Sequence, residues 1–405
     1  MSPRRSQPVR TRACIVRLAL LSMVAAGATR AQARVPAAAP PRPALTPSAD
    51  TNDAGAYYTY GSILMSKDPG AAYDGFYWAS RLEPSMAEAY YARAMAINLA
   101  WIALVIDKIE VDPGYELTPP QELALRFDTL MIKALTSDPF FDRRFDLLLF
   151  PRRVRAAIGR SRDPYFQGYY AYAMHEFGAA ADAWAKALRK DPNNISLHIQ
   201  RAQALYHANE RDSAYAELAL VADTIEARQQ QKLSREYESK EMLRYAMGII
   251  RVEQKRFDAA RELFGQALSE NLALYMAHVR LAGVDLVVAD TAGALNEFAL
   301  AVQIAGTDPV LRLQYARLLH AVARDEEAVA QLGVAIELDP YYTAPYELLG
   351  QVHDAHGRTA EATRAYREFV RRAAKRDPSL PRVRQRLAAL QADSAAAPGG
   401  PAVPH

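Results

Sequence analysis

Small and large apolar residues recur along the second half of the chain with a period of 34 residues. Tiny residues stand at Gly248, Ala282, Ala316 and Gly350. Twelve residues after each comes an alanine, then a large apolar residue, then another apolar one, namely Ala260, Phe264 and Ala267; Ala294, Phe298 and Ala301; Ala328, Leu332 and Ala335; and Ala362, Tyr366 and Phe369. Apolar positions three and four residues apart share one face of a helix, so this register predicts two helices per unit.

The tiny residue falls in the middle of the first predicted helix, where glycine costs roughly 1 kcal/mol relative to alanine. Its presence therefore indicates that the second helix approaches the first closely at this point. The small residues that flank the large one in the second helix are expected to form a slot for the next unit. Gly357 suits the turn between the two helices. The Asp-Pro pairs at 308–309 and 339–340 are interpreted as unit boundaries, since proline is tolerated only at the start of a helix.

This pattern resembles the tetratricopeptide repeat, a helix–turn–helix unit of 34 residues. In unit 343–376 the residues that match the family's signature are Tyr346, Leu349, Gly350, Gly357, Ala362, Tyr366 and Phe369, while the family's final proline is displaced to Pro378. An earlier unit at 161–194 carries Gly168, Ala180, Trp184, Ala187 and Pro192, and the next carries Ala202, Ala214, Leu218 and Val221. The resemblance implies an all-α fold, a right-handed superhelical solenoid of such repeats.

The register divides the chain into further segments. Before Gly248 it slips by 12 residues, and the polar, helix-forming residues 224–241 predict lengthened helices there. The expected segments are divergent repeats at 53–140 with an inserted loop at 108–119, an irregular connector at 141–160, the repeat array at 161–376 and a capping helix at 377–393. Within the connector, the apolar run 145–150 is expected to be buried, and Pro151 to interrupt any helix.

Both ends of the chain differ from the rest in composition. Residues 1–33 hold a cluster of arginines, a short apolar run at 18–28 and Ala-Gln-Ala at 31–33. This order is typical of a bacterial-type secretory signal peptide, and the run is too short for a stable membrane span. We therefore expect export to the periplasm or outside the cell. Residues 34–52, rich in Pro and Ala, predict a flexible linker, and 394–405 a disordered tail.

Charge and cysteine content change once the leader is set aside. The leader holds six of the 49 Lys and Arg residues and no acid, so the remainder has a net charge of −3. The pI near 8.7 of the whole chain therefore gives no reason to expect a nucleic-acid partner. The single cysteine, Cys14, lies in the leader, which excludes disulfides and thiol chemistry from the exported chain.

Candidate chemistry is sparse. His353, Asp354 and His356 fall within one helical turn, but zinc sites need three or four ligands and no second cluster accompanies them. We interpret these histidines as packing or turn residues and expect no metal. The sequence contains no glycine-rich phosphate loop, no Gly-x-Ser-x-Gly and no His-Glu-x-x-His. Neither enzymatic activity nor a cofactor is therefore expected.

The resemblance implies that the first helices line a concave groove that holds extended peptides or helices. The positions that would then face the groove, and so are candidates for partner binding, are Tyr91, Met95, Tyr165, Tyr169, Tyr172, Gln203, Tyr206, Tyr245, Arg317, His320 and Gln351. Tyrosine suits recognition because it is amphipathic and loses little side-chain entropy. The alternative is that these rings pack between neighbouring helices.

These features favour an exported protein-interaction scaffold that binds a peptide or protein of unidentified nature in the groove. Two other functions stay open. A glycan- or cell-wall-binding module would stack sugars on the same tyrosines. A structural subunit of an envelope complex would assemble through the ends of the array and form a homo-oligomer.

Export predicts that the leader is removed after Ala33, which leaves a chain that begins at Arg34. The intact mass of the protein recovered from outside the cytoplasm measures this directly. A mass that retains residues 1–33 would contradict the assignment of a cleaved signal peptide.

Overall fold

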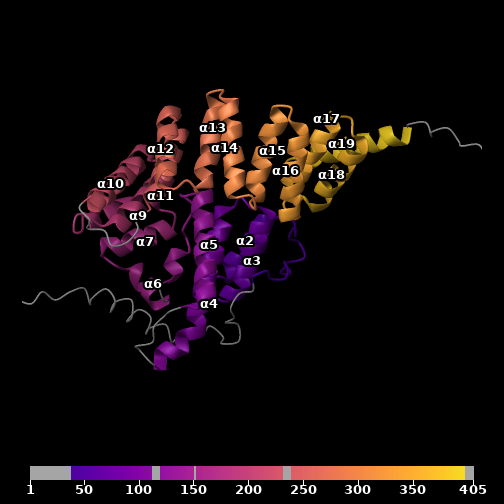
Figure 1. Cartoon of the computed structure of the whole chain (residues 1–405). Coiled ribbons are helices and arrows are strands. Elements are labelled where there is room, and N and C mark those ends of the chain that lie inside the picture. Colours follow the sequence, from indigo (N-terminus) through magenta and orange to yellow (C-terminus); the bar gives the residue numbers. More distant parts are fainter. Residues whose placement is uncertain (1–37, 112–118, 150–151, 231–238, 397–405) are drawn as a thin grey trace, which may run out of the picture. The chain divides into compact units, whose positions relative to one another are not determined.

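A computed structural model describes residues 38–111, 119–149, 152–230 and 239–396, and every regular element in these ranges is a helix (Figure 1). The predicted all-α fold is therefore confirmed for this part of the chain. The expected signal peptide at 1–33, most of the expected loop at 108–119 and most of the expected tail lie outside the described residues. No helix within the ranges above is both long enough and apolar enough to cross a membrane.

Consecutive helices pack side by side in pairs that are joined by short connections (Figure 1). The pairs are α2 (Ala54–Leu64) with α3 (Pro69–Leu82), α4 (Ala87–Val111) with α5 (Gln121–Ser137), α7 (Pro164–Ala173) with α8 (Phe177–Leu188), α9 (Ile195–His207) with α10 (Arg211–Gln230), α11 (Lys240–Glu253) with α12 (Phe257–Glu270), α13 (Tyr275–Val287) with α14 (Thr291–Ile304), α15 (Pro309–Ala321) with α16 (Asp325–Leu338), and α17 (Ala344–Ala355) with α18 (Thr359–Arg372). Outside the pairs lie the 3-10 turn η3 (Asp146–Leu149), α6 (Arg152–Ile158) and α19 (Leu380–Ala396).

The turn inside each pair repeats one backbone conformation. From α7 to α18, one residue in each turn has a positive φ, and these residues are His175, Asn209, Lys255, Ala289, Ala323 and Gly357. The next amide donates back into the first helix, as from Arg358 N to His353 O at 2.9 Å, which closes the helix end. Gly357, with φ +66°, is the turn residue that the sequence predicted.

The spacing of these turns confirms the register and its slip. Successive turn residues lie 34 apart, except for the step from Asn209 to Lys255, which is 12 residues longer. Helix α10 accounts for part of that length, because it has 20 residues where α8 has 12 and α12 has 14. The lengthened helix expected near residue 224 is therefore present.

The predicted close approach at the tiny residues is also confirmed. A Cβ added to Gly350 would lie 2.4 Å from the ring of Tyr366, and one added to Gly168 would lie 2.2 Å from Nε1 of Trp184. Neither distance is compatible with a carbon atom, so only glycine fits against these rings. At the equivalent positions 282 and 316, alanine is completely buried.

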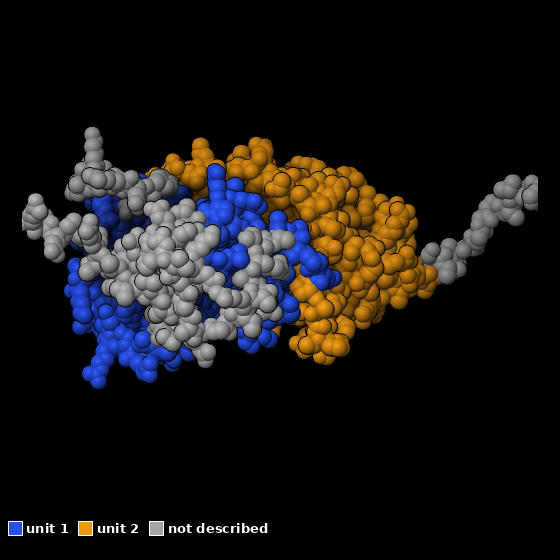
Figure 2. Space-filling model, turned by 90° about the horizontal axis from the view of Figure 1, so that it is seen from below, with its two compact units in different colours: residues 1–42, 60–77, 87–263 blue, residues 43–59, 78–86, 264–405 orange. Residues whose placement is uncertain are grey.

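The described residues form two compact units, which Figure 2 colours separately. Unit 1 comprises residues 1–42, 60–77 and 87–263, of which the structure describes those from 38 onward in the ranges given above. Unit 2 comprises residues 43–59, 78–86 and 264–405, described up to Ala396. Each unit therefore combines N-terminal residues with a later stretch of the helix pairs.

Within unit 2, N-terminal residues bind the last helix pairs. The backbone amide of Lys375 donates to Asp50 at 2.5 Å, and Asn52 donates to the carbonyl of Arg371 at 3.4 Å. This part of the expected flexible linker at 34–52 is therefore held against the end of α18, which corrects that expectation. The sequence gave no signal for it, because the contacts join single polar groups to main chain more than 300 residues away.

The end of α3 belongs to the same unit and packs on the connection between α16 and α17. Arg81 contacts the carboxylate of Asp339 through Nε at 2.7 Å and Nη2 at 2.9 Å, and Trp78 meets Tyr341 edge-on at 4.9 Å. Burial raises the pKa of Asp339, and the neighbouring Arg81 charge opposes that rise. A paired guanidinium thus compensates for a carboxylate that is only 8% exposed.

Two predicted boundaries shift. Helix α4 continues to Val111, so helix replaces the start of the expected loop at 108–119. Helix α19, which packs on α18 as the expected cap at 377–393 would, continues to Ala396 into the expected tail at 394–405.

Replacement of Gly350 by alanine should lower the free energy of unfolding by about 1–3 kcal/mol, because the new Cβ would overlap the Tyr366 ring. The matched control is Gly333→Ala in α16, where an added Cβ meets nothing within 4 Å. There, the better helix propensity of alanine should raise the free energy of unfolding by up to about 1 kcal/mol. Unfolding in denaturant measures both, and a stabilising Gly350→Ala would contradict the packing described here.

Candidate functional site

The first helices of unit 1 are covered by another part of the same chain. Residues 138–149, which connect α5 to α6 and which we call the inner segment, lie against α4, α7 and α9. They overlap the expected irregular connector at 141–160 and include three phenylalanines that are each at most 6% exposed, Phe140, Phe141 and Phe145. Eight of the eleven predicted groove residues belong to unit 1, so their surroundings depend on this segment.

On α4, Tyr91 is enclosed by the inner segment. Its ring packs on Phe141 at 4.9 Å and Phe145 at 6.1 Å, and its hydroxyl donates to Oδ1 of Asp146 at 2.6 Å. Burial raises the pKa of the Tyr91 phenol well above its ordinary value, and the Asp146 charge adds to the rise. Burial likewise raises the pKa of Asp146, against the opposing charge of Arg143. Tyr91 is therefore an internal hydrogen-bond donor.

On α9, Gln203 and Tyr206 hold the start of the inner segment. The Gln203 side chain is 4% exposed and donates from Nε2 to the main-chain oxygen of Phe141 at 2.8 Å. Tyr206 stacks on Phe140 with 3.8 Å between ring centroids and an interplanar angle of 7°. One side chain thus binds the main chain and its neighbour binds a ring, as a peptide-binding surface does.

On α7, the three predicted tyrosines pack within the unit. Tyr169 and Tyr172 lie against Trp184 at 5.6 and 5.9 Å, and the hydroxyls of Tyr165 and Tyr169 are 3.5 Å apart. Burial raises the pKa of both Tyr169 and Tyr172. At the end of this helix, His175 reaches Asp142 of the inner segment at 3.1 Å.

These contacts correct the expectation of an open tyrosine groove. Buried side chains at the predicted positions are Tyr91, Met95, Tyr172, Gln203 and Tyr245, all at most 6% exposed. Tyr245 is fully buried and donates to the carbonyl of Thr136 at 2.9 Å. A cavity of about 20 Å³ remains beside Asp146 and Tyr169, which is room for about one water molecule. The periodicity placed these residues on the right helix face, but this chain's own phenylalanines cover that face.

In unit 2 the corresponding face is exposed. Counting from the unit start at residue 343, the ninth, twelfth and thirteenth positions of the first helices form what we call the open strip. It consists of Gly283, Leu286 and Val287 on α13, Arg317, His320 and Ala321 on α15, and Gln351, Asp354 and Ala355 on α17. All nine are exposed or half-buried, and three of them, Arg317, His320 and Gln351, were predicted from the sequence.

The open strip changes in character along its length. At α13 it is apolar, since Leu286 is 41% and Val287 58% exposed. In the middle, Arg317 is exposed and pairs with no other described residue, whereas His320 binds Asp325 at 2.5 Å. The hydrogen bond from His320 lowers the pKa of Asp325, and a second one from His356 acts in the same direction. Apolar, cationic and polar groups thus follow one another across three repeats.

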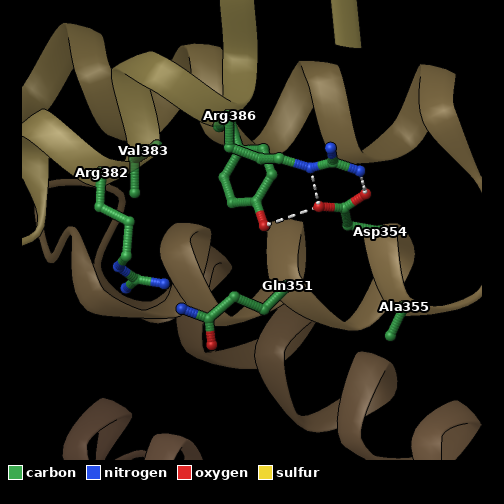
Figure 3. A pocket seen from close by; sticks show the side chains of 7 residues that line it. Gln351, Asp354, Ala355, Arg382, Val383 and Arg386 are labelled. Carbon is green, nitrogen blue, oxygen red and sulfur yellow. Dashed lines mark hydrogen bonds and ion pairs between the residues drawn. The ribbon is translucent and has the colours of Figure 1, made fainter. Parts of the chain in front are cut away.

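The strip ends in a pocket of about 470 Å³ between α17, α18 and α19 (Figure 3), called the C-terminal pocket below. The residues that line it are Gln351, Asp354, Ala355, Tyr366, Arg382, Val383 and Arg386. Arg386 grips Asp354 with two contacts of 2.7 and 2.6 Å, which hold the pKa of that carboxyl below its usual value. Burial raises the pKa of Tyr366 to about 12.

The two arginines of this pocket were not predicted. Arg382 and Arg386 lie one turn apart on the capping helix, a spacing that puts them on one face. The sequence analysis treated that helix only as a cap, and it did not extend the groove positions to Leu286 and Val287. The repeat register itself contained the signal for the latter two, because they follow Arg317 by position.

The histidine cluster of α17 does not converge on one point. His356 binds Asp325 at 2.7 Å, while Asp354 binds Arg386, and burial lowers the pKa of half-buried His353. Within the described ranges, no group of three or more His, Cys, Asp or Glu residues is placed to hold a metal ion.

Several solved structures are similar to this chain. YrrB, described as a TPR protein with an unusual peptide-binding site, has a TM-score of 0.39 and 20% identity over 51% of this chain and 100% of its own. MamA has a TM-score of 0.36 and 17% identity over 43% and 94%. The Cut9–Hcn1 hetero-tetramer of APC/C has a TM-score of 0.43 and 11% identity over 82% and 76%. No protein-family model and no curated sequence matches the chain. Its fold assignment therefore rests on its own register and helix contacts.

Removal of the Tyr91 hydroxyl should destabilise the chain by about 1–3 kcal/mol, because Tyr91→Phe leaves the buried Asp146 carboxyl without this donor. The control is Tyr170→Phe, since Tyr170 is 39% exposed and its change should stay within about 0.5 kcal/mol. Denaturant midpoints of the two variants decide. Equal midpoints would mean that the inner segment does not hold Tyr91 as described.

Proposed function

We propose that this chain is an exported protein-interaction scaffold whose open strip binds an extended segment of a partner protein. The observation that carries the proposal is the strip itself, where exposed side chains recur at the same positions of three successive first helices. Exposed Leu286 and Val287 supply apolar contact area, and Arg317 supplies a cation without a partner among the described residues. Such a surface suits binding better than catalysis, for which it offers no acid–base or nucleophilic arrangement.

The inner segment supports this proposal by example. In unit 1 the same helix positions already hold a non-helical stretch of chain, through a glutamine on its main chain and a tyrosine on its phenylalanine. The proposed partner would lie on the first helices of unit 2 in the same manner. Export, proposed from the leader sequence at 1–33, would place this partner in the periplasm or outside the cell.

The glycan-binding alternative loses its main support. It required open tyrosine rings for sugars to stack on, but Tyr91, Tyr172 and Tyr245 are buried by this chain's own residues. The open strip contains no aromatic side chain. A protein or peptide partner therefore fits this surface better than a glycan does.

A charge placed in the open strip should abolish partner binding. We expect Val287→Glu combined with Arg317→Glu to weaken binding by at least about 2 kcal/mol, as loss of interface hot spots does. The matched control is Leu272→Glu, since Leu272 is 73% exposed but lies outside the strip, between α12 and α13. Crosslinking capture from the envelope fraction, followed by affinity measurement with the captured partner, compares the variants. A partner retained equally by all three proteins would refute the proposal.

A further inference from the structure

Two glutamines occupy equivalent positions on their first helices. Gln203 of α9 and Gln351 of α17 both follow the tiny residue of their repeat, and whole repeats separate them once the insertion after α10 is allowed for. In unit 1, Gln203 donates to the main-chain oxygen of Phe141 at 2.8 Å. This position is therefore able to fasten the backbone of a non-helical segment that crosses the first helices.

Gln351 has no such segment over it. It is half-buried at the edge of the C-terminal pocket (Figure 3), and its Nε2 donates to Glu347 of the preceding turn at 3.1 Å. A side-chain amide has two N–H donors and an acceptor oxygen. Among the contacts of the described residues this single bond is the one that Gln351 makes, so hydrogen-bonding capacity remains for a ligand.

Two guanidinium groups lie beside Gln351. Arg382 is bonded to Glu347 and Arg386 to Asp354, yet their side chains remain 63% and 47% exposed. A guanidinium has five N–H donors, more than one carboxylate can accept. Both arginines therefore keep donors free to bind a second carboxylate, and they present them on the same face of α19.

The rest of the pocket is apolar. The ring of Tyr366, held over Gly350, lies with Val383 and Ala355 among the lining residues (Figure 3). The volume of about 470 Å³ falls within the range of sites that bind small ligands or side chains. A fitting ligand thus combines a carboxylate with an apolar group close to it.

We infer that the C-terminal pocket binds a carboxylate-bearing residue of an extended peptide. Gln351 binds the peptide main chain, Arg382 and Arg386 bind the carboxylate, and the Tyr366 ring packs against an adjacent apolar side chain. The inference rests on the proposed function, because the pocket is the end of the open strip, and it adds the chemistry of one anchor. The carboxylate belongs either to an acidic side chain or to the end of the peptide.

Three labelled peptides of sequence Gly-Phe-X-Leu-X-Gly test this by fluorescence anisotropy with the full chain. The first has X as Asp and an amidated end, the second has Asn and a free end, and the third has Asn and an amidated end. At least one of the first two should bind ten times more tightly than the third. That difference identifies which source of carboxylate the pocket takes.

Variants then locate the binding. Arg382→Gln with Arg386→Gln should weaken the tighter peptide at least tenfold, and Gln351→Ala should weaken it severalfold. The matched control is Arg384→Gln, which removes the same charge from an exposed position of α19 that does not line the pocket and should change affinity less than twofold. Thermal melting of each variant confirms that it is folded.

Each contrary result has a distinct meaning. Equal affinity for all three peptides, equal loss in Arg384→Gln, or no binding at millimolar concentration overturns the carboxylate anchor. Binding that is insensitive to the pocket variants but lost in Val287→Glu overturns the anchor and leaves the proposed function in place. A captured partner that is insensitive to the open-strip variants refutes the proposed function itself.

Discussion

The close approach of two helices at one small residue is the constraint on which the rest of this molecule depends. Where Gly168 meets Trp184 and Gly350 meets Tyr366, a single methyl group would collide with an aromatic ring. Glycine inside a helix costs roughly 1 kcal/mol, and burial of a large ring against the neighbouring backbone offsets this cost. Because the contact fixes how each first helix is rotated, it also fixes which residues face outward.

That rotation explains how far the sequence predicted the structure. The tiny residues, the turn at Gly357 and the displaced register before Gly248 all follow from contacts within one repeat, and such contacts leave a periodic trace in the sequence. The rotation also placed Gln203 and Tyr206 correctly on the face of α9. Local periodicity, however, says which face a residue is on and nothing about what covers that face.

The errors accordingly lie in long-range contacts. Phe141 is 62 residues away from Gln203, and Thr136 is 109 residues away from Tyr245. No pattern in the sequence joins these pairs, although the three phenylalanines of the non-repeating stretch 140–145 were a sign that it needed a place to be buried. The same limit hid the pocket arginines, since Arg382 meets Glu347 from outside the repeats.

The N-terminal residues of unit 2 have a consequence for how this protein folds. An array in which units contact only their neighbours has local contacts, folds rapidly and can be shortened from either end. Here Arg81 pairs with Asp339, and Asp50 accepts from Lys375, across 258 and 325 residues of chain. Closing such loops costs entropy before the contacts form, so unit 2 should complete its folding late and cooperatively. A fragment that begins at residue 264 would lack part of its own unit, and the chain is not divisible into freely exchangeable modules.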